Sequence, residues 1–153
     1  MPIRIGVIGT GIMGTDHVAT ITTAVSGAEV CCIADIDAKR AEVIASRVPG
    51  AKALSSAESL IESPDVDSVI IASSDATHAK YVTACIAARK PVLCEKPLAP
   101  TVPECEEILR LEEAAVSTKD PRHHVDLMRS RAEHKCSGRE LDVSNRSGCW
   151  SIA

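Results

Sequence analysis

The chain contains no phenylalanine, one tyrosine and one tryptophan among its 153 residues. Its 45% hydrophobic content must therefore form a core of small and branched aliphatic side chains. Proteins that bind single-stranded nucleic acid stack bases on aromatic side chains, so this scarcity argues against that function. The net charge is −4, and residues 1–116 carry 10 basic and 16 acidic side chains, which also argues against a nucleic-acid partner.

Long apolar runs and paired cysteine motifs are absent as well. No stretch reaches the roughly 18 consecutive apolar residues of a membrane-spanning helix, so we expect no membrane partner. The seven cysteines include no Cys-x-x-Cys pair, and most lie in apolar patterns, which is typical of a reduced, cytoplasmic protein. His134, Cys136 and Cys149 have the wrong spacing for the usual zinc sites, and we predict no metal site.

Short β-branched runs alternate with apolar residues spaced by three and four, which predicts strands alternating with helices. This order predicts an α/β fold, a doubly wound parallel sheet. The expected strands are residues 3–8, 29–34, 51–54, 68–73 and 92–94. Five helices are expected. The first ends at Gly27, the second runs from the N-cap Asp37 to Val48, and the third is a short helix between a capping box at Ser55–Glu58 and Pro64. The last two cover residues 79–88 and 101–115.

The first loop carries the pattern Gly-x-Gly-x-x-Gly between a strand and a helix, and in this context the pattern predicts a dinucleotide site. The first glycine permits a tight turn, the second lets a pyrophosphate approach the backbone, and the third lets the helix and the strand pack closely. The helix N-terminus adds partial positive charge. We therefore predict cofactor contacts from Gly9, Thr10, Gly11, Ile12, Met13 and Gly14. Asp16 and His17 follow in the first turn of the helix, where we assign no chemistry to them.

Asp35 ends the second strand about 20 residues after the loop, where a carboxylate can accept hydrogen bonds from the ribose hydroxyls of the adenosine. A carboxylate repels a 2′-phosphate, so the sequence favours NAD over NADP. Lys39 and Arg40 lie close by and leave dual use open, and we include Arg40 among the cofactor-binding candidates. Asp37 is better explained as the cap of the next helix.

Two further strands end in polar residues at the carboxyl edge of the sheet, where doubly wound proteins bind ligands. Ser73, Ser74, Thr77 and His78 follow the fourth strand and could line the ribose and nicotinamide, although helix capping by Thr77 would explain much of this pattern. Glu95 and Lys96 follow the fifth strand. They are either site residues or an exposed charge pair.

Four segments together resemble the Gfo/Idh/MocA oxidoreductases, and within them the inositol 2-dehydrogenase type: "IRIGVIGTGIMGTDH", "GAEVCCIADIDAKRA", "DVDSVIIASSDATH" and "ACIAARKPVLCEKPLA". The resemblance covers residues 1 to about 115 and implies a Rossmann domain. It also implies a dehydrogenase that passes hydride from a secondary alcohol of a cyclic polyol or sugar to NAD. It assigns Lys96 to catalytic proton transfer beside the nicotinamide and lets Pro97 shape the turn through a cis bond. For the full-length family enzymes a homo-oligomer is expected.

The sequence departs from the family after the fifth strand. We recognise neither the sixth strand nor the substrate domain, and Arg89 stands where the family has a glycine. We therefore predict a dinucleotide-binding domain over residues 1–116 and an irregular tail over 117–153, with room for a short helix near Val125–Glu133. Our hypothesis for the tail is translation in a shifted reading frame.

Two other functions stay open at this point. The chain could be a non-catalytic module, or pseudoenzyme, that binds NAD without turnover. A nucleotide-binding methyltransferase is more distant; it also uses a glycine loop and an acid at a strand end.

Overall fold

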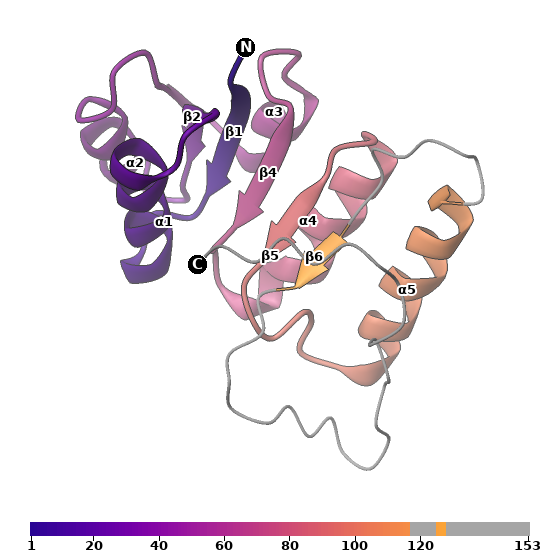
Figure 1. The fold of residues 1–153 in the computed structure, drawn as a ribbon. Helices are drawn as coiled ribbons and strands as arrows, with labels where there is room; N and C mark the ends of the chain where they lie inside the picture. Colours follow the sequence, from indigo (N-terminus) through magenta and orange to yellow (C-terminus); the bar gives the residue numbers. More distant parts are fainter. Residues whose placement is uncertain (117–124, 128–153) are drawn as a thin grey trace.

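The computed structural model describes residues 1–116 and 125–127, in which six strands alternate with five helices (Figure 1). The strands are short and rich in valine and isoleucine, and they mostly follow the predicted runs. In chain order the elements are β1 (Ile3–Ile8), α1 (Ile12–Ala24), β2 (Ala28–Ala34), α2 (Ala38–Ala45), β3 (Lys52–Leu54), α3 (Ala57–Glu62), β4 (Ser68–Ile71), α4 (Asp75–Ala87), β5 (Val92–Cys94), α5 (Val102–Val116) and β6 (Val125–Leu127).

The strands form one parallel sheet in the order β3-β2-β1-β4-β5-β6. This order confirms the doubly wound fold. The chain changes direction across the sheet between β1 and β4, and doubly wound proteins bind ligands at such a switch point, beyond the carboxyl ends of the strands.

The sixth strand corrects the sequence analysis, which found none after β5. Val125–Leu127 pairs in parallel with β5, so that Leu93 lies opposite Asp126. The sequence analysis left room for a short helix near Val125–Glu133 without assigning one. The first three of these residues form a strand, and the rest lie outside the described residues. Three residues are too few for any periodicity to appear, and pairing with a formed neighbour creates this strand.

Helices cover both faces of the sheet, and each face has its own apolar core (Figure 1). On one face α1 and α2 pack Val18 and Ile44 against Val7 and Ile33. On the other face α3, α4 and α5 pack Leu60, Val82 and Ile108 against β-strand residues such as Ile71. The buried members of both cores are aliphatic residues, alanine or cysteine, as the composition predicts. In residues 1–116 and 125–127 no helix combines the length and apolar character required to cross a membrane.

Two helix starts differ from the predictions. α4 begins at Asp75 with Ser74 as its N-cap, so Thr77 lies inside the helix and is not its cap. β4 correspondingly ends at Ile71. α3 is capped by Ser56, whose hydroxyl accepts from the N–H of Ser59, so the predicted box is displaced by one residue. The cap at Asp37 is confirmed, because its carboxylate accepts from the N–H of Arg40.

Arg89 ends α4 in the left-handed conformation, with φ of 56°, as the missing glycine predicts. A side chain with a Cβ is strained there, whereas glycine is not. We expect Arg89→Gly to raise the free energy of unfolding by about 1 kcal/mol in urea denaturation. Ala88→Gly is the matched control, since Ala88 has helical angles and its replacement should lower stability by roughly 0.5–1 kcal/mol. A loss of stability in both variants would contradict this account of Arg89.

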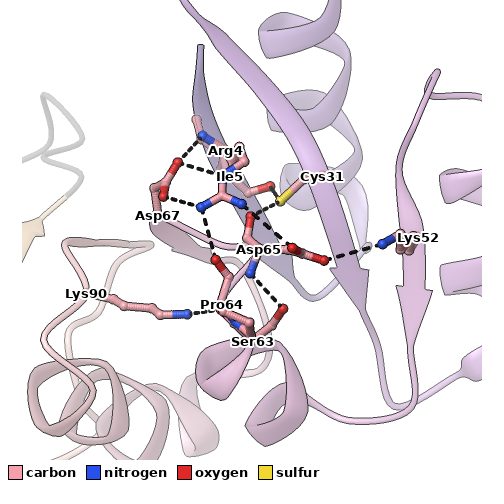
Figure 2. A network of polar contacts seen from close by, with 9 residues as sticks. All are labelled: Arg4, Ile5, Cys31, Lys52, Ser63, Pro64, Asp65, Asp67 and Lys90. Carbon is pink, nitrogen blue, oxygen red and sulfur yellow. Dashed lines mark hydrogen bonds and ion pairs between the residues drawn. The ribbon is translucent and has the colours of Figure 1, made fainter. Parts of the chain in front are cut away.

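A polar network joins the amino end of β1 to the loop before β4, on the edge of the sheet opposite the glycine loop (Figure 2). The Arg4 guanidinium donates to both carboxylate oxygens of Asp67, at 2.7 and 3.0 Å, and to the carbonyl of Pro64 at 3.0 Å. Asp65 pairs with Lys52 at 3.3 Å. This network fixes the entry of β4 beside β1, far from the carboxyl edge, and we assign it a structural role.

The Arg4 contacts make stability depend on acid pH. Hydrogen bonds from the Arg4 guanidinium and backbone N–H lower the pKa of Asp67 from 3.8 to about 2. Because the folded-state pKa is depressed, the stabilisation is complete above pH 4 or so and is lost as pH falls toward 2. We expect Asp67→Asn to cost at most about 1 kcal/mol at pH 7, since the side chain is 43% exposed and the pair is screened.

The measurement is chemical denaturation between pH 7 and pH 2. The variant should lose part of the wild-type slope below pH 4. Glu29→Gln is the matched control, because Glu29 is exposed on the adjacent strand opposite Arg4 and should leave the slope unchanged. An unaltered slope in Asp67→Asn would rule out the Arg4 contact as the cause.

Candidate functional site

A cleft of about 600 Å³ opens at the carboxyl edge of the sheet, at the switch point between β1 and β4. Four segments build it: the loop after β1, the end of β2, the start of α3 and the loop and first turns at α4. The lining residues are Ile8, Gly9, Gly11, Ala34, Asp35, Ile36, Arg40, Ser55, Ser56, Ala57, Glu58, Ala72, Ser73, Ser74, Thr77 and Tyr81. The sequence analysis named seven of these as site residues. The other nine were missed: Ile8, Ala34, Ile36, Ser55, Ser56, Ala57, Glu58, Ala72 and Tyr81.

The three glycines of the loop meet three different constraints. Gly9 has φ of +89°, and a Cβ there would lie 2.6 Å from the carbonyl oxygen of Ala72. A Cβ on Gly14 would lie 1.9 Å from the carbonyl oxygen of Gly9, so α1 packs on the loop backbone itself. Within residues 1–116 and 125–127, and apart from its own chain neighbours, no atom lies within 4 Å of a Cβ built on Gly11. The protein leaves this space open beside the N-terminus of α1, where an anion is favoured.

The other residues of the loop divide between the interior and the surface. Thr10 is 3% exposed, and its N–H and hydroxyl both donate to Asp35. Ile12 is 90% exposed and Met13 46% exposed, so two large apolar side chains stand in solvent at the start of α1. Whether Ile12 and Met13 contact a cofactor stays a prediction.

Asp35 occupies the end of β2 and receives donors from three directions. Its carboxylate accepts from Thr10 N at 2.6 Å, from Asp37 N at 2.8 Å and from the Arg40 guanidinium at 2.6 Å. Burial alone would raise the pKa of Asp35, but these bonds, with Arg40 first, lower it to about 2. The group is therefore an ionised acceptor at neutral pH. Arg40 is half exposed and is the one donor that can swing away to let ribose hydroxyls in.

The loop between β4 and α4 brings three hydroxyl groups to the opposite wall. Thr77 Oγ1 donates to the carbonyl of Ser74 at 2.7 Å, and Ser73 Oγ lies 2.8 Å from Thr77 Oγ1. Because the Thr77 hydrogen is committed to Ser74, Ser73 is the donor in the second bond. Ser73, Ser74 and Thr77 thus line the cleft, and their oxygens still have acceptor capacity. Their contact with a cofactor stays a prediction.

His78 differs from these neighbours because it does not line the cleft. It is 1% exposed, with Nδ1 at 2.6 Å from the carbonyl oxygen of Pro97 and Nε2 at 3.1 Å from that of Ser73. It lies between the loop after β4 and the turn after β5, behind the cleft surface.

The turn after β5 holds the charged pair singled out in the sequence. Glu95 is 7% exposed, and its Oε1 lies 2.7 Å from Nε2 of His17 on α1. Lys96 is exposed and makes no hydrogen bond or ion pair with the rest of the described chain. The bond between Lys96 and Pro97 is cis, as the family resemblance implied. The pair is thus divided: Glu95 points into the protein and Lys96 out of it.

His17 is the residue that sequence reasoning missed. It falls three residues after Gly14 and four before Ile21, on the stripe that α1 buries. A polar residue on a buried helical stripe needs a partner, and this was the available signal. Its partner is 78 positions away in the chain, which the sequence could not indicate. Among residues 1–116 and 125–127 no group of histidine, cysteine and acidic side chains is arranged to hold a metal ion.

Residues 3–119 match the GFO_IDH_MocA family model, an oxidoreductase family with an NAD-binding Rossmann fold. The chain belongs to this family. Membership confirms the resemblance seen in the sequence, together with NAD as the family's cofactor.

Curated relatives of this Gfo/Idh/MocA chain include inositol 2-dehydrogenase 2 of Saccharopolyspora erythraea, 47% identical over 129 residues, which are 84% of this chain and 37% of the relative. Inositol 2-dehydrogenase of Acidothermus cellulolyticus is 47% identical over 112 residues, 73% of this chain and 33% of that one. This chain thus spans about a third of the length of the curated relatives it matches.

A solved structure gives the same picture. Myo-inositol dehydrogenase from Lactobacillus casei, in complex with NAD(H) and myo-inositol, superposes with a TM-score of 0.72 at 34% identity, covering 74% of this chain and 34% of that chain. The alignment with inositol 2-dehydrogenase 2 of Saccharopolyspora erythraea covers 129 residues and is longer than the predicted domain of residues 1–116. Similarity therefore continues past Val116, into the region that contains β6. The domain boundary at residue 116 and the shifted reading frame of the tail remain predictions. Both have to be consistent with a similarity that extends past Val116.

Proposed function

We propose that this chain is the nucleotide-binding part of an NAD-dependent dehydrogenase acting on a secondary alcohol of a cyclic polyol or sugar, with myo-inositol as the first substrate to test. One observation carries the proposal: the open space at Gly11, the ionised Asp35 and the unpaired Lys96 all belong to the carboxyl edge of one sheet. The names of the inositol dehydrogenase relatives supply the substrate class.

The residues present fit the cofactor. The loop Gly9–Gly14 and the N-terminus of α1 would hold the pyrophosphate, Asp35 the adenosine ribose, and Ser73, Ser74 and Thr77 the opposite wall of the cleft. NAD supplies the hydride acceptor when bound. Lys96 would hydrogen-bond the substrate hydroxyl and take part in moving its proton. Glu95 holds the backbone beside Lys96 and is a cofactor-binding candidate only through that contact.

The structure also bears on the choice between the two nicotinamide cofactors. An ionised Asp35 would repel a 2′-phosphate, which supports NAD. Arg40 is the cation close enough to offset this repulsion, because it already reaches the Asp35 carboxylate. We therefore propose NAD as the preferred cofactor, with weaker binding of NADP.

A second candidate is an NAD-binding module without turnover. Among the described residues the cleft is lined by cofactor-binding candidates, and Lys96 is the one candidate for proton transfer. A methyltransferase function does not fit membership of an oxidoreductase family.

A cytoplasmic location is also a proposal, and five free cysteines among the described residues support it. A homo-oligomer is proposed by family resemblance alone.

Two measurements separate these candidates. Titration with NADH, NADPH and S-adenosylmethionine, followed by nicotinamide fluorescence and calorimetry, should show that NADH binds and S-adenosylmethionine does not compete. Assays with NAD and myo-inositol should then show turnover that Lys96→Met abolishes. Binding without turnover favours the module, and failure to bind either nicotinamide cofactor contradicts both candidates.

A further inference from the structure

The turn that carries Lys96 is held on both sides by histidines from two different helices. The residue before Lys96 is Glu95, whose carboxylate meets His17 of α1. The residue after it is Pro97, whose carbonyl meets His78 of α4. Lys96 itself is exposed and has no bond of its own within the described chain. Its position therefore depends on its two neighbours.

The His17 contact is a bond within the protein interior. The exposed fractions of the two side chains are 15% for His17 and 10% for Glu95, and Nε2 and Oε1 are 2.7 Å apart. With the carboxylate of Glu95 as the acceptor, Nε2 of His17 is the donor in this bond. The N–H of Glu95 also donates to the carbonyl of Ile71 at 2.9 Å. Glu95 is thus tied to α1 by its side chain and to β4 by its backbone.

The His78 contacts fix the other side of the turn. Both of its ring nitrogens face carbonyl oxygens, those of Pro97 and Ser73, and a carbonyl oxygen can only accept. A neutral imidazole satisfies one of the two, and the doubly protonated ring satisfies both. In either state His78 links the turn after β5 to the loop that forms the hydroxyl-lined wall of the cleft.

We propose that His17 and His78 are positioning residues that hold the turn from Glu95 to Pro97 so that Lys96 is presented at the edge of the cofactor cleft. The inference rests on the proposed function in assigning the work at the reaction centre to Lys96. A long, flexible lysine contributes to proton transfer only when its backbone is fixed relative to the bound reactants. Two histidines that served packing alone would have no reason to contact the two residues that flank one exposed lysine.

The first test is backbone amide exchange of the chain without cofactor, measured by NMR. Removing one holding bond by His17→Leu should speed exchange of the Glu95 amide, which donates to Ile71, by about tenfold, with no comparable change in β1. His17→Gln places an amide nitrogen near the position of Nε2 and should restore slow exchange. Asp16→Asn is the matched control on the same helix, because Asp16 is exposed and should leave exchange at the turn unchanged.

His78 is tested in the same way with two variants. His78→Leu removes both bonds, whereas His78→Asn retains a donor near the position of Nδ1 and should preserve more of the protection of the Glu95 amide. Asp75→Asn is the exposed control on α4. If His78→Leu does not fold, the comparison of His78→Asn with Asp75→Asn still tests the role. Equal protection of the turn in these two variants contradicts a holding role for the bond between His78 and Ser73.

The second test reads the position of the lysine with NADH bound. Wild-type chain should show nuclear Overhauser contacts between the Lys96 side chain and the nicotinamide, and His17→Leu should lose them while NADH affinity stays within about threefold. Wild-type chain that binds NADH without these contacts contradicts the role of Lys96 in the proposed function. Contacts and slow exchange that persist in His17→Leu contradict the positioning role, whatever the outcome for Lys96.

Discussion

Gly11→Val is expected to weaken NADH binding by roughly 100-fold or more while the chain remains folded. In the part of the chain that the structure describes, no atom beyond the chain neighbours lies within 4 Å of a Cβ at this position, so the valine meets no obstacle there. The same space is where a pyrophosphate must approach the backbone N–H groups, and a branched side chain fills it. Valine is a poor N-cap, so we allow a loss of about 1 kcal/mol in stability. Fluorescence titration with NADH and thermal unfolding provide the two measurements.

Gly14→Ala is the matched comparison within the same loop. Its main expected effect is on stability, whereas the main effect of Gly11→Val is on NADH binding. A Cβ there would lie 1.9 Å from the carbonyl oxygen of Gly9, so the backbone must move. We expect a loss of about 3 kcal/mol or more in the free energy of unfolding, with weaker NADH binding as a secondary effect. Normal NADH affinity in Gly11→Val would show that the open space is not the pyrophosphate site. Unchanged stability in Gly14→Ala would contradict the close packing of α1.

The elements that were predictable from sequence are those whose signal is local. The runs that became β1 and β5 were predicted with their exact ends, since each is a β-branched or apolar run bounded by other residue types. The cap at Asp37 also held, because a cap is made within four residues. Prediction failed at the start of α4, where Ser74 and Thr77 are both good caps and the sequence does not rank them.

The sixth strand failed for a different reason. Val125–Leu127 is a strand because β5 offers it a free edge, and its register on Val92–Cys94 is a tertiary property. The same limit applies to the site. The glycine loop and Asp35 were predicted because their residue types and their places after strands can be read along the chain, whereas the pairing of His17 with Glu95 depends on α1 and the turn after β5 meeting in the folded protein.

Asp35→Ser is expected to change the choice of cofactor. A serine cannot accept two hydrogen bonds as an anion, so NADH affinity should fall by roughly 10- to 100-fold, the effect of losing bonds to a charged group. Removal of the charge also frees Arg40, which donates to Asp35 at 2.6 Å in the wild-type chain. Arg40 can then pair with a 2′-phosphate. The ratio of NADPH to NADH affinity should therefore rise, and it is measured by fluorescence titration with both cofactors.

The pH dependence separates this effect from general damage to the site. Because the pKa of Asp35 is about 2, the carboxylate is ionised throughout pH 5–9, and Asp35 contributes no titration to wild-type NADH affinity in that range. Asp35 should accordingly add no pH dependence of its own to the preference for NADH in this range. Asp37→Ser is the matched control, since Asp37 caps α2 two residues away and its loss should leave the cofactor ratio unchanged. In Asp35→Ser, the further change Arg40→Gln should cancel the gain in NADPH binding. A gain that survives in the double variant would assign the phosphate preference to another cation, with Lys39 the nearest along the chain.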